Sequence, residues 1–493
     1  MTPTLVLLLI GIYFSGVLLI SYVTARGATQ TTFFTADKNS PWYLVAYGMI
    51  GATLSGVTFV SLPGWVGTSG FSYFQTTMGY VLGYAVIATV LLPLYYKLNL
   101  VSIYSFLEDR FGFWSYKTAA FFFLLSRTIQ AAAKLYIVSI VLQTFLFDEL
   151  NVPYFWTVFI TIALIWLYTF RGGIKTVVWT DVLQTTFMLL AAGITVYIIA
   201  KDLGLGFSEM LQTIQENGKY SKTFFWDPSQ PSYFFTQFIS GAFLALVMTG
   251  LDQDMMQKNL TCRTAPDAQK NMFWFSLILV AVNILFLTLG AMLYIYTDRM
   301  GIPLPAKGDE LFPMLAKDYL GVFAASVFLL GIIAAAYSSA DSALTSLTTS
   351  FCIDFLNFGK TKTGSAQKRT RRIQVHMMFS LILLLTVILF KLINNTSALD
   401  AVLKVATYTY GPLLGLFAFG LLTRKKLKDK WVPVVCALSP LLCFLMNFFS
   451  EELFNGYRFG YELLMLNGAM TFLGLLLLSK KGELYEKRLL EWK

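Results

Sequence analysis

The chain has 493 residues, of which 56% are hydrophobic and 13% are charged, and its mean hydropathy is +0.64. Soluble globular domains carry about 25% charged residues, so this balance excludes a soluble fold and predicts a membrane protein. The apolar residues come in runs of about 20, the length of a helix that crosses a bilayer core of roughly 30 Å, and not in the alternation of a transmembrane β-barrel.

The composition also argues against several functions. Four cysteines and a single histidine, His376, are too few soft ligands for a haem, iron–sulfur or zinc centre, so no cofactor is expected. The net charge of +10 follows the loops on one side of a membrane, which argues against a nucleic-acid partner. An intramembrane enzyme would need a nucleophile with its base or a metal cluster, and one histidine supplies neither. The chain is therefore not expected to be an enzyme.

Hydropathy predicts thirteen membrane-spanning helices. In chain order they cover residues 3–25, 42–68, 76–96, 116–146, 154–170, 176–200, 232–256, 270–297, 319–352, 371–391, 397–422, 431–449 and 459–479. The longest loops, 201–231 and 298–318, contain amphipathic stretches typical of short surface helices. The first run lacks the positive flank and cleavage site of a signal peptide, so it should stay in the mature protein.

The distribution of basic residues predicts the orientation of the chain. With the N-terminus outside, most of the 37 lysines and arginines fall on the cytoplasmic side, as the positive-inside rule requires. Three of them, Arg127, Lys134 and Lys404, fall at membrane depth. We expect a multi-pass protein of the plasma membrane, that is, a bacterial inner membrane, with its N-terminus outside and its C-terminus in the cytoplasm.

Two of the spans contain residues that interrupt a membrane helix. The second span has Gly51 and Gly56 followed by Pro63, and the seventh span has Gly250 close to Asp252. Unwound helices at corresponding places in two repeats indicate an inverted-repeat transporter, in which free backbone carbonyls can bind ions. The alternative is that the glycines allow close helix packing, which is common in membranes.

The ninth span carries the densest cluster of hydroxyl groups, and at about 100° per residue these groups share one face of the helix. The stripe consists of Ala335, Ser338, Ser339, Ser342 and Ser346, with Asp341 and Thr345 at its edge. Hydroxyls and carbonyls bind a hard alkali cation weakly enough to release it during a transport cycle. The alternative, hydroxyls that bond to their own or neighbouring helices, does not account for the carboxylate of Asp341.

A second carboxylate, Asp181, lies within the sixth span, after a turn at Gly172 and Gly173. An ionisable group inside the membrane is costly and is by default a functional candidate, here as a cation ligand or a proton carrier. The alternative is a structural ion pair with Arg127 or Lys134, which lie seven residues apart on one helix face.

At these residues the chain resembles the sodium:solute symporter family, and the resemblance covers essentially the whole length. Three pieces match in order: the broken span ending Leu62-Pro63-Gly64, the Gly172-Gly173 turn leading to Thr180, Asp181 and Gln184, and the Ser338-Ser339 stripe. The resemblance implies an all-α LeuT-type fold of two inverted five-helix repeats with one helix before and two after. It divides the chain into an extra N-terminal helix (1–30), a first repeat (40–202), an inverted second repeat (203–425) and two C-terminal helices with a short cytoplasmic tail (426–493).

The resemblance also implies where sodium would bind. The main site would use backbone carbonyls of Gly51, Leu54 and Ala335 and the hydroxyls of Ser338 and Ser339. Some members of the family have a second cation site, which here would consist of Asp181, Asp341 and Ser342. The family has a hydroxyl where this chain has Asp341, so Asp341 could strengthen cation binding, carry a proton or pair with Lys404.

The solute would bind near the membrane midplane, between the broken spans and the eleventh span. Candidate contacts are Thr53, Thr58, Thr77, Tyr80, Met248, Lys404 and Tyr408. Lys404 replaces a glutamine that contacts sugars in similar carriers, so a sugar cannot be held by the same hydrogen bonds. A lysine beside an aqueous cavity favours an anionic group, whereas a salt bridge from Lys404 to Asp341 would leave it without a substrate contact.

We therefore predict a sodium-coupled symporter that imports a small organic solute by alternating access around a central site. Its expected partners are the solute, the sodium ion and the lipid bilayer, and it is expected to work as a monomer. The alternative is a transporter-like membrane sensor of a solute, which would normally carry a soluble signalling module. A passive channel is disfavoured because it has no need of broken spans in matching repeat positions.

Overall fold

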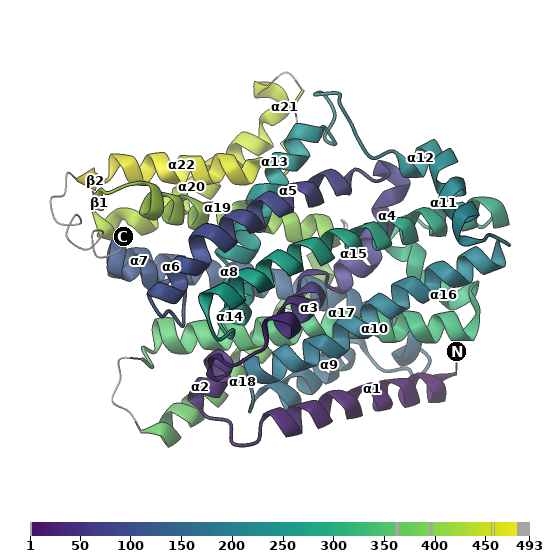
Figure 1. Ribbon diagram of the computed structural model, residues 1–493, viewed down its shortest axis with the longest axis horizontal. Helices are drawn as coiled ribbons and strands as arrows, with labels where there is room; N and C mark the ends of the chain where they lie inside the picture. The colour runs from purple at the N-terminus through teal and green to yellow at the C-terminus, as the bar shows by residue number, and fades with distance from the viewer. Residues whose placement is uncertain (1, 360–363, 394–397, 455, 458, 481–493) are drawn as a thin grey trace.

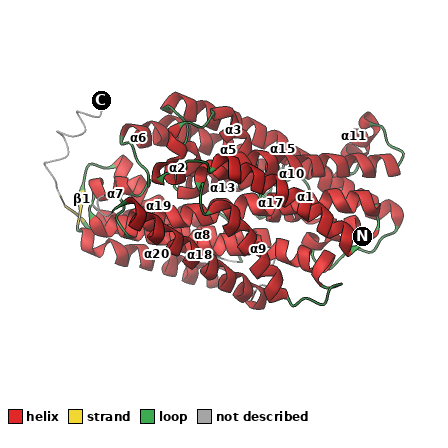
Figure 2. Ribbon diagram, turned by 90° about the horizontal axis from the view of Figure 1, so that it is seen from below, coloured by secondary structure: helices red, strands yellow, loops and turns green. Residues whose placement is uncertain are grey.

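The computed structural model describes residues 2–359, 364–393, 398–454, 456–457 and 459–480 as a bundle of helices (Figure 1). The helices of the N-terminal half are α1 (Pro3–Thr24), α2 (Gln30–Thr35), α3 (Trp42–Thr53), α4 (Gly56–Ser69), α5 (Tyr73–Val86), α6 (Leu92–Lys97), α7 (Ser105–Arg110), α8 (Phe113–Leu142), α9 (Tyr154–Thr169) and α10 (Ile174–Asp202). Most long helices run side by side along the long axis of the molecule (Figures 1 and 2).

The C-terminal half continues the bundle. Its helices are α11 (Phe207–Glu216), α12 (Gly218–Ser221), α13 (Phe234–Ala245), α14 (Gln253–Asn259), α15 (Ala265–Met300), α16 (Leu311–Asp318), α17 (Gly321–Ser350), α18 (Ser365–Ile393), α19 (Ala398–Leu422), α20 (Val432–Phe448), α21 (Ser450–Leu453) and α22 (Leu463–Leu477). Two short strands, β1 (Lys426–Leu427) and β2 (Ser479–Lys480), pair antiparallel with Lys426 opposite Lys480.

Short turns with non-α hydrogen bonding extend or join several helices. The π-helical turns are η2 (Ile87–Leu91), η3 (Gln143–Phe147), η4 (Leu246–Gly250) and η6 (Phe351–Phe355), and the 3-10 turns are η1 (Ala36–Lys38), η5 (Gly308–Glu310) and η7 (Asp429–Trp431). The π-helical turns η2, η3, η4 and η6 directly follow α5, α8, α13 and α17. In particular, η4 is the last turn of α13 before the chain unwinds toward α14.

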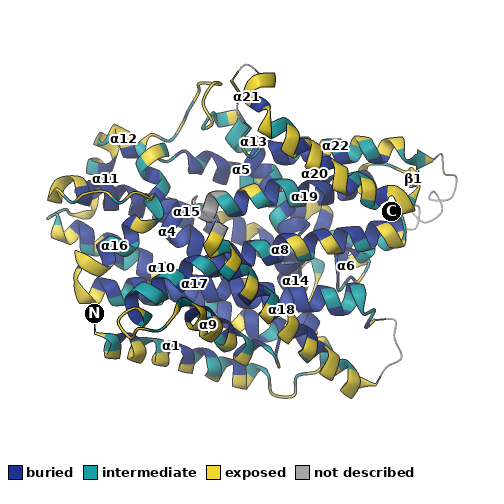
Figure 3. Cartoon of the chain, turned by 180° about the vertical axis from the view of Figure 1, so that it is seen from behind, coloured by how far each residue is buried: buried dark blue, intermediate teal, exposed yellow. Residues whose placement is uncertain are grey.

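Within the described residues, nine helices are long and apolar enough to cross a membrane, and two bent helix pairs and two shorter apolar helices bring the total in line with the thirteen predicted spans. The shorter ones are α9 and α22. Exposed side chains line the outer faces of helices such as α1 and α18, where lipid would cover them (Figure 3). The polytopic all-α membrane fold predicted from the sequence is confirmed.

Both predicted interruptions are present as sharp bends. α3 and α4 meet at 61°, and the helix formed by α13 and η4 meets α14 at 69°. The loops 201–231 and 298–318 contain the short helices α11, α12 and α16, as their amphipathic patterns predicted. The bend of α3 and α4 lies against α15, α10 and α17, which together form the centre of the bundle. The division at 1–30, 40–202, 203–425 and 426–493 stays a prediction.

α5 and α13 approach each other closely because glycines lie at their contact. A Cβ atom at Gly79 would overlap the carbonyl oxygen of Phe238, and one at Gly241 would overlap that of Thr76. Small residues of this kind let two membrane helices pack backbone to backbone, where van der Waals contact replaces the hydrophobic effect. The glycines of this pair therefore serve packing, whereas those near the α3 bend adjoin the candidate site.

Replacing Gly79 by Ala tests this packing. The added methyl group has no space, so α5 must shift away from α13, and overpacking of this kind costs about 1–3 kcal/mol. We expect a lower melting temperature of the detergent-purified protein. Gly11→Ala in α1 is the matched control, because nothing lies within 4 Å of a Cβ atom there. Equal melting temperatures for the two variants would show that the contact is not tight.

Candidate functional site

The break between α3 and α4 leaves backbone carbonyl groups without helical partners. Leu54 (φ −87°, ψ 78°) and Ser55 (φ −71°, ψ 176°) depart from helical geometry. The backbone amides that would donate to the last carbonyls of α3 in a continuous helix are therefore turned away. Within the described part of the chain, the carbonyl oxygens of Gly51 and Leu54 receive no hydrogen bond. Such oxygens inside a membrane need another partner, and a cation is one.

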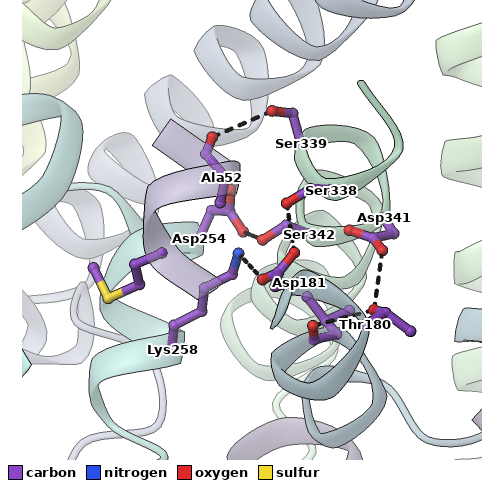
Figure 4. A network of polar contacts seen from close by, with 12 residues as sticks. Ala52, Thr180, Asp181, Asp254, Lys258, Ser338, Ser339, Asp341 and Ser342 are labelled. Carbon is purple, nitrogen blue, oxygen red and sulfur yellow. Dashed lines mark hydrogen bonds and ion pairs between the residues drawn. The ribbon is translucent and has the colours of Figure 1, made fainter. Parts of the chain in front are cut away.

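The hydroxyl stripe of α17 lies directly against this break. The Ser339 hydroxyl donates to the carbonyl oxygen of Ala52 at 3.2 Å (Figure 4). A Cβ atom at Gly51 would lie 3.2 Å from Oγ of Ser338, so the two residues are in contact. Ala335, one turn earlier on α17, is fully buried. The structure therefore brings Gly51, Ser338 and Ser339 together where α3 meets α17, with Leu54 at the end of α3 and Ala335 one turn earlier on α17.

Asp181 of α10 forms a buried ion pair with a residue that the sequence analysis missed. Nζ of Lys258 in α14 lies 2.6 Å from Oδ2 of Asp181, and the two side chains are each 1% exposed. Oδ1 of the same carboxylate accepts a hydrogen bond from the Ser338 hydroxyl at 2.6 Å (Figure 4). The predicted alternative of a structural ion pair is correct in kind, but its partner is Lys258 and not Arg127 or Lys134.

A second buried ion pair joins α8 to α14. Arg127 contacts the carboxylate of Asp254, and the Ser342 hydroxyl of α17 donates to the other oxygen of that carboxylate. The sequence analysis singled out Arg127 and Ser342 but not Asp254. Both missed residues, Asp254 and Lys258, are charged groups in the short helix that follows the broken seventh span. That placement next to a break was the available signal.

Asp341 has a different environment from Asp181. Its Oδ2 accepts hydrogen bonds from Tyr168 at 2.8 Å and Thr180 at 3.5 Å, while its Oδ1 is buried and has no partner in the described residues. Lys404 is therefore not its partner. The three side chains predicted for a second cation site, Asp181, Asp341 and Ser342, thus contact three different groups. Within the described residues, no cluster of three His, Cys, Asp or Glu side chains could hold a metal ion.

The second break satisfies its carbonyl groups with tyrosines. The hydroxyl of Tyr95 donates to the Gly250 carbonyl at 3.0 Å, and that of Tyr104 donates to the Leu251 carbonyl at 3.1 Å. Asp252 caps α14 by accepting from the amides of Asp254 at 2.8 Å and Met255 at 3.2 Å. Tyr95 and Tyr104 therefore supply hydrogen bonds to the free carbonyls at this break, whereas a cation could bind the free carbonyls between α3 and α4.

A cavity of about 80 Å³ lies beside the first break. Of the predicted substrate contacts, Thr53, Thr58, Tyr80 and Met248 line it. Two basic residues of α8 that had been considered only as ion-pair partners, Arg127 and Lys134, line it as well. Leu54, whose carbonyl is unpaired, is also part of the wall, so the cavity adjoins the candidate sodium site.

The remaining predicted contacts lie elsewhere. Lys404 and Tyr408 line a separate hollow of about 340 Å³, and Lys404 is exposed. Thr77 is buried and donates to the carbonyl of Tyr73 at 3.1 Å. Tyr73 lines both hollows and is hydrogen-bonded to Tyr80 through their hydroxyls at 2.8 Å, so this tyrosine pair stands between them.

Comparison with known proteins places this geometry in a family. Residues 33–429 match the model of the sodium:solute symporter family. The chain is 25% identical to the sodium/sialic acid symporter SiaT of Proteus mirabilis, over 85% of this chain and 83% of that one. It is 28% identical to human sodium-coupled monocarboxylate transporter 1, over 83% of this chain and 68% of that one.

Solved structures show the same fold. A substrate-bound, outward-open structure of a Na+-coupled sialic acid symporter superposes with a TM-score of 0.82 at 21% identity, covering 97% of this chain and 99% of that chain. The resemblance inferred from the broken spans and the Ser338-Ser339 stripe is thereby confirmed for residues 33–429, and the fold agrees over 97% of the chain. The chain belongs to the sodium:solute symporter family.

Proposed function

We propose that this sodium-coupled symporter imports a small organic anion together with one sodium ion, which binds between α3 and α17. The observation that carries the proposal is that the carbonyls of Gly51 and Leu54 receive no hydrogen bond from any described residue, at the end of α3 where Gly51 contacts Ser338 and Ala52 contacts Ser339. Each hydroxyl donates its proton to another oxygen, to Asp181 or to Ala52, and therefore keeps lone pairs for a cation. Oxygen ligands of this type suit sodium.

The proposal includes the orientation of the chain in the membrane and its function as a monomer. An outside N-terminus puts most basic loop residues in the cytoplasm, and the plasma membrane is the expected location. Import then means that the hollow with Lys404 faces outside and leads past Tyr73 to the inner cavity. Rocking of one helix bundle against the other would expose that cavity to the cytoplasm. A single chain contains both the candidate sodium ligands and the cavity, which supports a functional monomer.

A single sodium ion is favoured by the ion pair of Lys258 with Asp181. A second sodium at Asp181 would have to displace an ammonium group that already lies 2.6 Å from the carboxylate. The Ser342 hydroxyl is engaged with Asp254, and Asp341 is engaged with Tyr168. An internal lysine thus supplies the positive charge that a second ion would supply.

Removal of both hydroxyls in Ser338→Ala/Ser339→Ala tests the main site. Two of the five proposed ligands are lost, so we expect the sodium concentration that half-maximally stabilises the purified protein to rise at least several fold. Thermal unfolding against sodium, with potassium as the reference cation, measures it. Ser346→Ala is the matched control, since its hydroxyl lies on the same stripe but donates to the Ala343 carbonyl. An unchanged sodium requirement in the folded double variant would rule out these ligands.

The number of sodium ions can be read from the same titration. Above saturation, each bound ion adds about 1.4 kcal/mol of stability per tenfold rise in sodium. We expect the slope of one ion for the wild type, and a slope of two ions for Lys258→Gln, in which Asp181 is left free to bind a second ion. Asp181→Asn/Lys258→Gln should return the slope to one. A slope of two ions in the wild type would contradict the role assigned to Lys258.

Loss of one partner should also affect folding. Removal of one member of a buried ion pair costs about 3–5 kcal/mol because the other charge stays buried without compensation. We therefore expect Lys258→Gln in potassium to melt well below the wild type and sodium to recover part of the difference. The double variant should melt closer to the wild type in both salts, since neither charge remains. Equal melting of the single and double variants would show that the two charges are not coupled.

A further inference from the structure

Lys134 in α8 is a buried cation that the sodium site does not use. Its side chain lines the inner cavity and the residue is 6% exposed. Arg127 and Lys258 each contact a carboxylate, whereas Lys134 makes no hydrogen bond and no ion pair with any residue that the structure describes. It is therefore a buried basic side chain at the wall of an open space, near the Asp252 carboxylate but without a direct ion pair to any described residue.

A lysine in this position is costly to keep charged unless an anion binds it. Burial of a charged group without a direct partner costs several kcal/mol, so such a group either loses its proton or takes up an anion. Arg127 lies two helical turns away on the same face, about 10 Å along the axis, and its charge is already matched by Asp254. An anion that enters the cavity would supply what Lys134 lacks.

The rest of the cavity lining indicates what the remainder of the anion should be. Apolar and aromatic side chains form much of its wall, including Tyr84, Leu244, Met248 and Leu279. Its volume of about 80 Å³ is well below the roughly 300 Å³ of a pocket for a drug-sized ligand. The space matches a carboxylate with a short apolar tail of a few carbon atoms better than a nine-carbon sugar acid.

We propose that Lys134 is the substrate-binding residue that pairs with the carboxylate of a short-chain monocarboxylate, whose apolar tail packs against Met248 and Tyr80. The inference rests on the proposed function, because it places the transported anion beside the sodium site. It moves anion recognition from Lys404 to Lys134. Lys404 is exposed in the outer hollow, where solvent and salt screen its charge, so it attracts anions without selecting among them.

Ligand binding to the purified full-length protein tests the proposal. The probes are butyrate, its neutral analogue butyramide, and N-acetylneuraminate as a larger acid, each in sodium and in potassium, and the readout is thermal stabilisation. We expect butyrate in sodium to stabilise the wild type and butyramide and N-acetylneuraminate to have no effect. Lys134→Gln should weaken butyrate at least tenfold, and Lys134→Arg, which keeps the charge, should weaken it less.

Two further variants identify which lysine binds the carboxylate of butyrate. Lys201→Gln removes the same charge from an exposed position at the end of α10 and should leave butyrate binding unchanged. Lys404→Gln should weaken it less than threefold. Without solute, Lys134→Gln should melt no lower than the wild type, because it removes a buried basic group that makes no direct ion pair. Loss of binding then cannot be attributed to misfolding.

Several results would overturn the proposal. These are equal binding of butyrate and butyramide, binding of N-acetylneuraminate in preference to butyrate, loss of butyrate binding in Lys404→Gln but not in Lys134→Gln, or no binding of butyrate at all. A sodium titration without solute distinguishes failure of the Lys134 proposal from failure of the proposed sodium site. Sodium that stabilises the wild type and Lys134→Gln equally supports the sodium site even when butyrate does not bind. Butyrate binding that depends on the charge of Lys134 but not on sodium would support Lys134 as the anion-binding residue and contradict sodium coupling.

Discussion

A helix that is broken inside a membrane exposes carbonyl groups that lipid cannot hydrogen-bond, and the centre of this protein is arranged around those groups. The two breaks meet this need in different ways. At the break before α14, tyrosine hydroxyls from the other half of the chain donate to the carbonyls of Gly250 and Leu251. At the break between α3 and α4, no described residue donates to the carbonyls of Gly51 and Leu54, and Gly51 lies against the serine stripe of α17. One break is thus closed by the protein itself, and the other is open to an ion.

The buried charges connect these elements to one another. Asp181 joins α10 to α14 through Lys258 and to α17 through Ser338, and Asp254 joins α14 to α8 through Arg127 and to α17 through Ser342. Each carboxylate therefore receives one cation and one serine hydroxyl from α17. Since a buried charge without a partner is costly, α17 cannot move away from α14 without leaving both carboxylates less satisfied. This network holds the serine stripe against the first break.

Much of this site could be predicted because its signals are local. Glycines and proline within an apolar span mark a break, and the serine stripe follows from helical periodicity alone. The partner of Asp181 could not be predicted, because Lys258 reaches it only after the second break turns α14 toward α10. Arg127 and Lys134 show the same limit, since they share one face of α8 and yet, among the described residues, Arg127 forms an ion pair and Lys134 does not. The resemblance to sugar carriers makes Lys404 a candidate substrate contact, and the packing of α19 places it in the outer hollow.

The end of α3 belongs both to the proposed sodium site and to the wall of the inner cavity, and this suggests how ion and solute would be coupled. Gly51 contacts Ser338 of α17, and Leu54, whose carbonyl is the other proposed sodium ligand, contributes with Thr53 to the wall of the inner cavity. Sodium bound at the carbonyls would fix the backbone of the break and so position that wall before the solute arrives. The solute then has less conformational freedom to remove on binding, and by linkage it must strengthen sodium binding by the same factor. Coupling in this arrangement needs no long pathway, because the shared element is a single unwound turn.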